Sequence, residues 1–409
     1  MLRQERIIIV GAGIVGLSTA YALLSAGMHQ VIVLEQEAVD HRRASSHGAS
    51  RLLRFEYGPD AFYSHMVRLS LSRWQRLQHV THRTLYTQTG LLALGKEDDN
   101  FTQPSYQVLR GMGLPIERLS EMACRQRFPQ FATHAYDTLT YNSQAGVLHA
   151  SNCLHTLKDC ITDLGGVIYE SCRVTTIKSD NLMQPLRLHL SSGEELLADR
   201  VVLATGCWIQ RLLAHLHLPV RLTRQYLLYF AGLSPASFNA RVFPAFTADD
   251  LYGFPLLSMH NGYGPSWLKA ASHNFGPTID PDDTSPPDQH IIAQIVGKLR
   301  ELLPALRRAE LVHIDACTYD VSPDEDFILD RLPYAPRVIF ATGLTGHGFK
   351  FGLLLGELLS SMVYDAQPIV PLERFRLARF SQQQVLQKSH ESIKVSKSCL
   401  SPQDYQLRG

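Results

Sequence analysis

The chain has 409 residues, of which 45% are hydrophobic and 19% charged, and its formal net charge at pH 7 is +1. This length is enough for two domains with a large core, and nothing in the near-zero net charge indicates a strongly basic surface for nucleic acid or an anionic membrane. The seven cysteines are scattered and never form a CxxC pair. That pattern argues against a disulfide framework or a zinc site and indicates a reducing, cytoplasmic compartment.

Near the start of the chain, residues 6–35 have the pattern of a strand, a glycine turn, a helix and a second strand. The uncharged run 7–28 could also suggest a signal peptide or a membrane helix. Its interruption by GAGIVG favours the strand–turn–helix interpretation, so we predict a protein without a membrane segment.

The glycine turn has the form GxGxxG, made by Gly11, Gly13 and Gly16. Backbone amides and a helix N-terminus can face a pyrophosphate there with no side chain in the way. Glu35 ends the next strand, where a carboxylate can hydrogen-bond ribose hydroxyl groups. The motif predicts an ADP-containing cofactor but leaves nicotinamide and flavin both open.

Further along the chain, a helix is predicted from Ala61 to His79, and two buried strands, at 198–206 and 336–343, each end in Thr-Gly. The region 216–309 between them is rich in aromatic residues, proline and glycine. Strands are expected there at 224–230, 251–257 and 267–275, and a helix at 291–303. His79 and His82 have loose metal-like spacing without further ligands, so no metal site is predicted.

Five segments together are more specific: SSHGASRLLRFEYG (45–58), ATGCW (204–208), LKAASHNFGPTIDP (268–281), DACTYD (315–320) and TGLTGHGFKF (342–351). In order and spacing they resemble the monomeric sarcosine oxidase family of the D-amino acid oxidase superfamily, which includes N-methyltryptophan, pipecolate and amadoriase-like oxidases. The resemblance runs from about Ile7 to Pro371. It implies FAD, attached covalently through the sulfur of a cysteine that corresponds to Cys317.

The predicted fold class is accordingly α/β, with a doubly wound, Rossmann-like FAD-binding domain and a second α+β substrate domain of mixed sheet that covers the flavin. Residues 1–90, 145–215 and 310–380 are assigned to the first domain. Residues 91–144 and 216–309 are assigned to the second, and 381–409 form a polar tail.

The resemblance also implies roles for individual residues. Arg54 and Lys350 would hold a substrate carboxylate, and Lys269 would promote the reaction of reduced flavin with oxygen. The implied catalytic residues are Lys269, His273, Arg51 and His47; the substrate-binding residues are Arg54, Lys350, Tyr252, Tyr319 and Gly346; the cofactor-binding residues are Gly11, Gly13, Gly16, Glu35, Ser45, Arg51, Gly206, Cys317, Gly346, Gly348 and Lys350.

Residue types support several of these roles. Lys269 and His273 are four apart and would share one face of a strand, and Lys350 between two phenylalanines is poorly explained as a surface residue. A thiolate at Cys317 would require nearby cations. The alternatives that stay open are a core cysteine, a structural histidine, a surface lysine, tyrosines of the core, and an ion-paired helix face for Arg51 and Arg54.

The sequence therefore predicts a monomeric, cytoplasmic FAD-dependent amine oxidase. Its substrate would be a small secondary amino acid, N-methylated or cyclic, converted to an imine while oxygen is reduced to hydrogen peroxide. The alternatives are a flavin dehydrogenase of the amadoriase, pipecolate or saccharopine type, an NAD-dependent dehydrogenase, and a non-catalytic flavin-binding protein. A long segment at 256–267, and Thr247 where the family has methionine, leave the identity of the amine open.

Overall fold

The computed structural model describes residues 5–179, 184–257 and 266–380. The predicted tail at 381–409 and most of the segment 256–267 lie outside these described residues.

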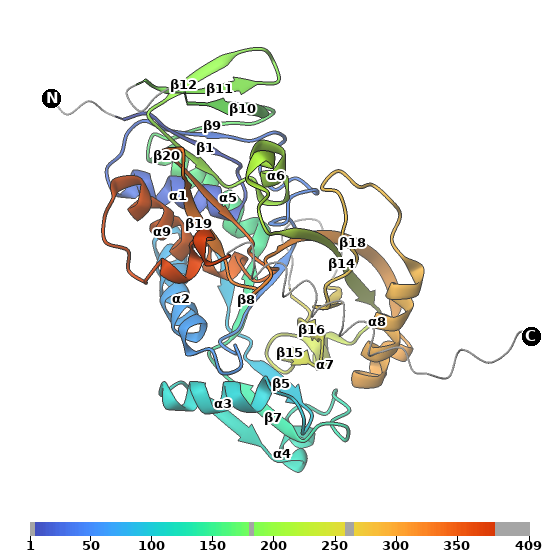
Figure 1. Ribbon diagram of the computed structural model, residues 1–409. Coiled ribbons are helices and arrows are strands. Elements are labelled where there is room, and N and C mark those ends of the chain that lie inside the picture. The colour runs from blue at the N-terminus through green and yellow to red at the C-terminus, as the bar shows by residue number, and fades with distance from the viewer. Residues whose placement is uncertain (1–4, 180–183, 258–265, 381–409) are drawn as a thin grey trace, which may run out of the picture.

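Strand β1 (Ile7–Val10) lies inside a six-stranded sheet (Figure 1) with the order β19–β20–β13–β1–β2–β9. Its sequence IIIV is buried throughout, as is typical of a central strand in a parallel sheet. Every neighbouring pair is parallel except β19 with β20. The other strands are β2 (Val31–Leu34), β9 (Val167–Tyr169), β13 (Arg200–Leu203), β19 (Ile328–Leu332) and β20 (Ala335–Thr342).

The two strands predicted to end in Thr-Gly are β13 and β20, which lie next to one another on one side of β1. Helices α1 (Ile14–Ser25), α5 (Ala150–Asp163) and α9 (Gly352–Tyr364) share an apolar core with β1. The opposite face of the sheet packs on α6 (Ile209–Leu212) and on a small sheet of β10 (Val174–Lys178), β11 (Leu186–Leu190) and β12 (Glu195–Ala198). The doubly wound α/β prediction is confirmed.

Helix α2 (Ala61–Thr81) extends the predicted helix by two residues. Asp60 caps its N-terminus: the Asp60 carboxylate accepts hydrogen bonds from the backbone N–H groups of Phe62 and Tyr63 and so satisfies two of the free donors of the first turn.

The second large sheet has eight strands and runs through the right and lower parts of Figure 1. All of its neighbouring pairs are antiparallel except β15 with β5, so the sheet is mixed as predicted. In sheet order the strands are β18 (Glu310–Val321), β14 (Arg221–Ala231), β17 (Leu268–Ser272), β16 (Leu251–Gly253), β15 (Ala245–Ala248), β5 (Leu91–Gly95), β7 (Thr138–Asn142) and β6 (Ile116–Leu119).

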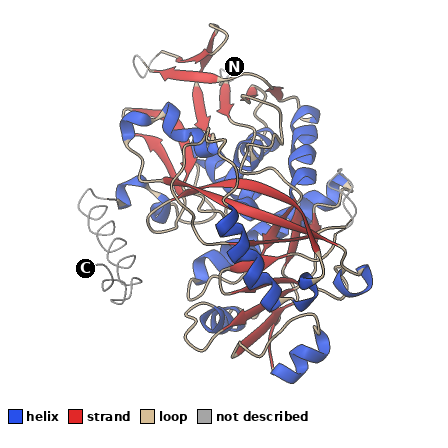
Figure 2. Ribbon diagram, turned by 90° about the vertical axis from the view of Figure 1, so that its right-hand side faces the viewer, coloured by secondary structure: helices blue, strands red, loops and turns tan. Residues whose placement is uncertain are grey.

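Side chains alternate between the two faces of this sheet, as the period of a strand requires. Leu228, Phe230, Leu268 and Ala270 share a core with helix α8 (Gln289–Leu302), which lies across the sheet in Figure 2. Lys269, the residue between Leu268 and Ala270, points to the other face. That face looks toward the six-stranded sheet and carries the candidate site.

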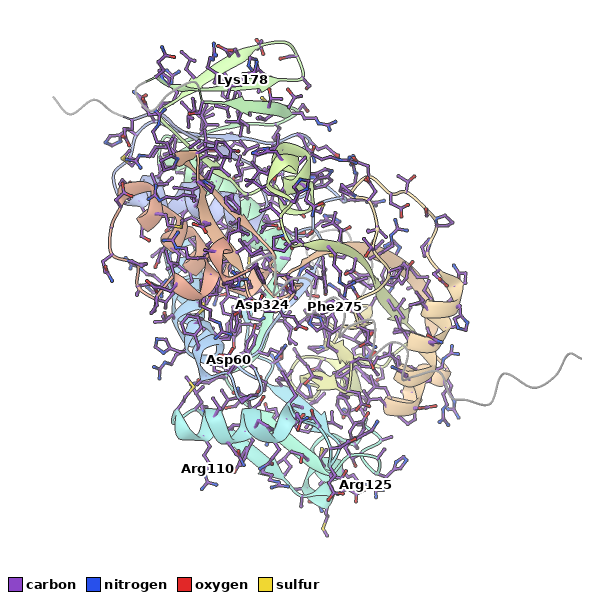
Figure 3. The ribbon with its side chains drawn as sticks, in the orientation of Figure 1. Asp60, Arg110, Arg125, Lys178, Phe275 and Asp324 are labelled. Carbon is purple, nitrogen blue, oxygen red and sulfur yellow. The ribbon has the colours of Figure 1, made fainter. Side chains whose placement is uncertain are left out.

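The remaining elements complete the lower and connecting parts of the molecule, and Figure 3 marks Lys178 on β10 at one end and Arg110 and Arg125 on α3 and α4 at the other. They are the sheet of β3 (Ser50–Leu53), β8 (Gly146–His149) and β4 (Tyr86–Thr87), helices α3 (Thr102–Gly111), α4 (Glu121–Arg127) and α7 (Pro235–Phe238), and the short 3-10 helices η1 (Gly206–Trp208), η2 (Ala214–Leu216), η3 (Pro304–Arg307), η4 (Phe349–Phe351), η5 (Glu373–Phe375) and η6 (Leu377–Arg379).

The division into two domains remains a prediction. Its segment 310–380 contributes β18 to the eight-stranded sheet and β19 and β20 to the six-stranded one. Among the described residues no helix has both the length and the apolar character needed to cross a membrane.

Candidate active site

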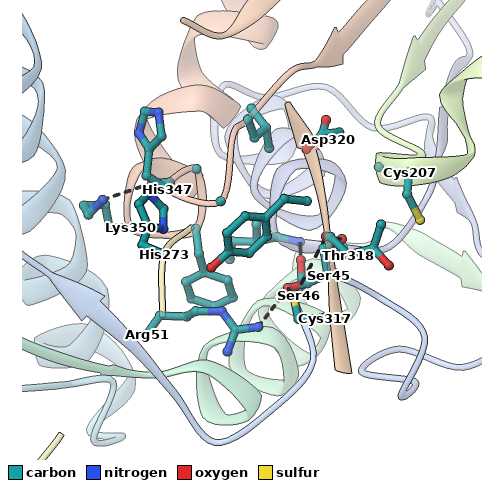
Figure 4. A pocket seen from close by; sticks show the side chains of 18 of the residues that line it. Ser45, Ser46, Arg51, Cys207, His273, Cys317, Thr318, Asp320, His347 and Lys350 are labelled. Atoms are coloured by element: carbon teal, nitrogen blue, oxygen red, sulfur yellow. Dashed lines mark hydrogen bonds between the residues drawn. The ribbon is translucent and has the colours of Figure 1, made fainter. Parts of the chain in front are cut away.

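A cavity of about 1140 Å³ lies between the two large sheets and is lined by residues of both. One part of its wall contains Gly11, Glu35 and Thr205, and another contains His273, His347 and Lys350. Figure 4 shows His273, His347 and Lys350 grouped on one side of the view, with Ser45, Ser46 and Cys317 on the other. The volume is at the upper end of ordinary ligand pockets, which suits an extended cofactor together with a small substrate.

The glycine turn is fixed by sterics. Gly11 has φ +103°, and a Cβ there would lie 2.4 Å from the carbonyl oxygen of Ala204 at the end of β13. A Cβ on Gly16 would lie 1.9 Å from the carbonyl oxygen of Gly11, so α1 can pack against the turn only without a side chain. Gly16 therefore shapes the turn from outside the cavity lining, whereas Gly11 and Gly13 line the cavity themselves.

Glu35 is held at the carboxyl end of β2 by two backbone amides. The N–H of Ala12 donates to its Oε2 at 2.7 Å and the N–H of Glu37 to its Oε1 at 3.1 Å. Nearby, the hydroxyl oxygen of Thr205 is buried in the cavity wall and has no hydrogen-bond partner among the described residues. A buried acceptor, an orphaned hydroxyl and a bare glycine turn fit the polar part of an ADP-containing ligand.

Arg51, on β3, organises the loop 45–50 beside the cavity. Its Nη2 donates to the carbonyl oxygens of Ser45 at 2.8 Å and His47 at 2.5 Å, and its Nη1 donates to that of Ser50 at 2.9 Å. The Ser45 hydroxyl donates to the Thr318 carbonyl at 2.7 Å, which ties the loop to β18. The guanidinium thus fixes three carbonyl groups of one loop while keeping its positive charge in the cavity wall.

Cys317, on β18, faces this loop, with its Sγ 3.8 Å from the carbonyl oxygen of Ser45. Burial raises the pKa of the thiol, and the charges of Arg51 and Lys269 act in the opposite direction. Two cysteines that the sequence interpretation did not select, Cys172 and Cys207, also line the cavity. Burial raises the pKa of both, and nearby carboxylates, Glu194 beside Cys172 and Asp320 beside Cys207, raise it further. Cys317 is thus the cavity cysteine whose surroundings favour a thiolate most.

Lys269 is 4% exposed, and its Nζ donates to the carbonyl oxygen of Ser50 at 2.9 Å. Burial and the Arg51 charge lower its pKa to about 7. His273 follows directly after β17, which ends sooner than the predicted strand, and both residues line the cavity as predicted. Burial and the charges of Arg54 and Lys350 lower the pKa of His273 to about 4, so its imidazole is neutral at physiological pH.

Two basic side chains meet over one aromatic ring at the same side of the cavity. The Arg54 guanidinium lies 4.8 Å and the Lys350 ammonium nitrogen 5.1 Å from the ring centroid of Tyr57. Lys350 is 4% exposed; burial, and then the Arg54 charge, hold its pKa well below the usual range. Arg54 donates to the backbone carbonyl of Glu56, whose buried carboxyl group has a raised pKa. A pair of cations in a wall of this kind has the character of a carboxylate-binding site.

Tyr57 is a residue of this site that the sequence interpretation missed, although it stands in the segment SRLLRFEYG that was singled out. Its hydroxyl accepts a hydrogen bond from Lys350 Nζ at 2.7 Å. Its position three residues after Arg54 was visible in the sequence, but the contact with a residue 293 positions away was not.

The tyrosines and glycines of the predicted substrate pocket also come together. Tyr252 and Tyr319 line the cavity with their hydroxyl groups in contact, and burial raises the pKa of both. Gly346 has φ +71°, and a Cβ there would lie 2.2 Å from the Tyr319 ring. Glycine at position 346 is therefore required to make room for the Tyr319 ring. Gly348, Gly206 and Thr247 line the same cavity.

His47 lies apart from the other predicted site residues. Its Nδ1 is 2.9 Å from the Asp40 carboxylate, and its side chain is not part of the cavity lining. Its backbone carbonyl group accepts a hydrogen bond from Arg51 and so connects it to the site. A role for His47 in the chemistry stays a prediction and would be indirect.

Comparison with known proteins agrees with this geometry. A family model described as FAD dependent oxidoreductase matches residues 6–362. The chain is 32% identical to peroxisomal sarcosine oxidase of Mus musculus over 393 residues, covering 94% of this chain and 97% of that protein. It is 30% identical to N-methyl-L-tryptophan oxidase of Yersinia pestis (strain Pestoides F) over 382 residues, covering 91% of this chain and 99% of the relative.

Solved structures show the same fold at lower sequence identity. NikD, an unusual amino acid oxidase essential for nikkomycin biosynthesis, superposes with a TM-score of 0.76 at 20% identity, covering 91% of this chain and 97% of its own. L-proline dehydrogenase from P. horikoshii gives a TM-score of 0.79 at 17% identity, covering 94% and 99%. With the family model spanning both the glycine turn and Lys350, the choice between flavin and nicotinamide is decided, and the chain belongs to the family of FAD dependent oxidoreductases.

Proposed function

We propose that this flavoprotein oxidises the C–N bond of a small secondary amino acid, N-methylated or cyclic, to an imine and passes the electrons to molecular oxygen, giving hydrogen peroxide. The observation that carries the proposal is the pair of basic side chains, Arg54 and Lys350, that share the Tyr57 ring beside the neutral His273. The names of the relatives, sarcosine oxidase and N-methyl-L-tryptophan oxidase, support the choice of a secondary amine.

The residues that would hold FAD extend along the cavity. Gly11 and Gly13 would face its pyrophosphate, Glu35 its ribose, and Ser45, Arg51, Gly206, Gly346 and Gly348 the parts nearer the flavin ring. Bound FAD supplies the two-electron acceptor that no side chain can provide.

Arg54 and Lys350 would bind the carboxylate and thereby fix the position of the neighbouring C–N bond. Charge-assisted hydrogen bonds of this kind are shorter and stronger than neutral ones, and holding the substrate in one orientation lowers the entropic part of the barrier. Tyr252 and Tyr319 would form the wall around the substituent on nitrogen. His273, being neutral, can accept a hydrogen bond from the substrate amine without adding a third positive charge.

A substrate panel with two readouts tests the proposal. N-methyl and cyclic amino acids are expected to bleach the yellow protein anaerobically and to release peroxide in air. The variant Arg54→Met should bind a simple carboxylate inhibitor about 10–100-fold more weakly, because a charged donor to an anion contributes roughly 1.5–3 kcal/mol. Its flavin content should stay close to that of the wild type.

The outcomes separate the alternatives. Bleaching that yields no peroxide in air but reduces an added dye would indicate the flavin dehydrogenase alternative. A yellow protein that no member of the panel bleaches would contradict the proposal and leave the non-catalytic flavin-binding protein.

We further propose that FAD is attached covalently through Cys317. The cations Arg51 and Lys269 near its sulfur support this assignment, because the thiolate is the nucleophile in such a linkage. Flavin fluorescence should therefore stay with the polypeptide on a denaturing gel and be lost from it in Cys317→Ser. Cys207→Ser is the matched control, since Cys207 lines the same cavity but burial and the Asp320 charge both raise the pKa of its thiol, and it should keep the bound flavin. Release of the flavin from denatured wild-type protein would refute covalent attachment.

The proposal also includes a monomeric protein in the cytoplasm. The six cysteines of the described residues are free, which suits a reducing compartment.

A further inference from the structure

Three polar groups connect the buried Lys350 to the surface by hydrogen bonds. Lys350 Nζ lies 2.7 Å from the hydroxyl oxygen of Tyr57, and that oxygen lies 3.2 Å from Nδ1 of His347. The other ring nitrogen of His347, Nε2, lies 3.2 Å from the carbonyl oxygen of Glu325, an exposed residue in the turn between β18 and β19. His347 itself is half-buried, and both residues line the cavity, so the outer end of the series lies nearer to solvent than Lys350 does.

The direction of every bond in this series follows from its outer end. A carbonyl oxygen can only accept, so Nε2 of His347 must carry a proton. In a neutral imidazole Nδ1 is then the acceptor, and the Tyr57 hydroxyl must donate to it. The Tyr57 oxygen is left to accept from Lys350. Each group therefore donates outward, from Lys350 toward the surface.

The surroundings keep His347 neutral, and within the described part of the chain no carboxylate forms an ion pair with its ring. Burial and the Lys350 charge hold the pKa of His347 well below its usual value. The rings of Tyr63, Phe327 and Phe351 enclose the imidazole. The charged or titratable groups that face this series are Arg54, Glu56, Asp60, His273, Glu325, Asp326 and Arg374, and all of them except Glu56 line the cavity.

We propose that Tyr57 and His347 form a proton relay that lets Lys350 give up a proton to solvent when the cavity is empty and regain it when a carboxylate binds. This inference rests on the carboxylate site of the proposed function and assigns Tyr57 and His347 as positioning residues for the protonation of Lys350.

The transfer balances without any other reactant. On release, a Lys350 Nζ–H bond breaks as a Tyr57 O–H bond forms, the original Tyr57 O–H bond breaks as a His347 Nδ1–H bond forms, and the Nε2 proton passes to water. The net change is an ammonium converted to an amine plus one proton in solution, and the imidazole of His347 is left as its Nδ1–H tautomer. The outward bond directions derived above are therefore those of the state in which Lys350 is charged. Uptake follows the same steps in reverse. A zwitterionic amino acid therefore meets a neutral Lys350, which can become charged against the incoming carboxylate.

Acetate binding to the FAD-loaded protein tests the first half of the proposal without turnover. Titration calorimetry in buffers of different ionisation enthalpy counts the protons exchanged on binding. Net uptake is expected at slightly alkaline pH, and Lys350→Met should abolish it. Acetate binding with no proton uptake would overturn the relay and leave the proposed oxidation intact, whereas failure of acetate to bind would contradict the carboxylate site and the relay together.

The rate of proton uptake tests the second half. With a pH indicator in weak buffer, stopped-flow mixing of acetate with Tyr57→Phe should show proton uptake slowed by at least about tenfold, because the ring is kept and only the relaying hydroxyl is lost. Tyr63→Phe is the matched control: its ring stacks on Tyr57 and contacts His347, but its hydroxyl faces the backbone N–H of Phe327 at 3.4 Å. This control should match the wild type.

His347→Ala provides an independent variant. It should slow proton uptake as Tyr57→Phe does, and added imidazole should restore the rate in proportion to its concentration, which a purely structural defect would not show. Uptake in Tyr57→Phe as fast as in the wild type, or equal slowing in Tyr63→Phe, would overturn the relay.

Discussion

Lys269 combines deep burial with a charge that depends on pH. Its amine lies between the Ser50 carbonyl and the Phe254 ring, and burial together with the Arg51 charge lowers its pKa to about 7. A fixed cation at this place would stabilise the negative charge that develops when oxygen accepts its first electron. A compact ammonium group suits such a role better than a delocalised guanidinium.

Replacing Lys269 by Met should therefore affect only the oxygen half of the cycle. Anaerobic reduction by substrate should stay near the wild-type rate, while reoxidation by oxygen slows by at least about tenfold, which corresponds to about 1.4 kcal/mol of transition-state stabilisation. Because a lysine is charged below its pKa, wild-type reoxidation should also slow as the pH rises through about 7, and the variant should lack that step. Stopped-flow measurement of flavin reduction and of flavin reoxidation across pH tests this prediction. Equal slowing of both rates in Lys269→Met would contradict the role assigned to Lys269.

At the scale of elements, the turn between β1 and α1 depends on close backbone packing. Gly16→Ala would place a methyl group 1.9 Å from the Gly11 carbonyl oxygen, inside van der Waals contact with backbone that cannot move aside. Overpacking of this kind costs about 1–3 kcal/mol or more, and the displaced turn should also load less FAD. Thermal unfolding and the flavin-to-protein absorbance ratio measure the two effects.

Gly297 offers a control of the same chemistry. It lies within α8, and a Cβ there would meet nothing within 4 Å. Gly297→Ala should be neutral or raise stability by about 0.5–1 kcal/mol, since alanine is the better helix former. A Gly16→Ala protein as stable and as yellow as Gly297→Ala would show that the turn tolerates a side chain.

The elements themselves were predictable where a single local pattern decides them. The buried run IIIV, the GxGxxG turn and the helix after Asp60 depend on neighbours in sequence, and their positions agree with the structure. The strands expected at 251–257 and 267–275 are shorter than predicted, as β16 and β17. The ends of these strands are set by their hydrogen-bond partners. The backbone N–H of His273 donates to the carbonyl oxygen of Asp250, outside the regular strand pairing, and the residue pattern along a single strand cannot predict such a contact.

At the scale of the whole molecule, the resemblance predicted which residues meet, and the structure supplies how they meet. Cys317, Lys269, His273, Arg54 and Lys350 all line one cavity. Local sequence could not reveal Tyr57 and His347 as hydrogen-bonded partners or the placement of His47 outside the lining, because each depends on contacts between distant segments. Side-chain pairing across the fold is the part that a single sequence leaves undetermined.

Arg374 is a second long-range contact of this kind, and it joins three separate parts of the chain next to the cavity. From η5 its Nε donates to the Asp326 carboxylate at 2.7 Å, in the turn before β19, and its Nη1 donates to Asp60 at 3.2 Å, at the start of α2. The guanidinium also lies 4.9 Å from the ring centroid of Tyr63. One side chain thus connects η5 to the start of α2 and to the turn before β19.

Arg374→Met should lower the free energy of unfolding by about 1–3 kcal/mol, because two neighbouring carboxylates would lose their shared cation. This range lies between the roughly 0–1 kcal/mol of surface pairs and the 3–5 kcal/mol lost when a buried pair is broken, as suits an arginine side chain that is 33% exposed. Arg83→Met removes a more exposed ion pair with Asp159, in which both side chains are about half-exposed, and should lower the free energy of unfolding by no more than about 1 kcal/mol.

Denaturant unfolding of the two variants, at low salt and at about 1 M salt, compares the two losses of stability. High salt should reduce only part of the loss in unfolding free energy caused by Arg374→Met, because salt screens a partly buried ion pair less than an exposed one. Equal costs for the two substitutions would mean that Arg374 does no more than an ordinary surface ion pair.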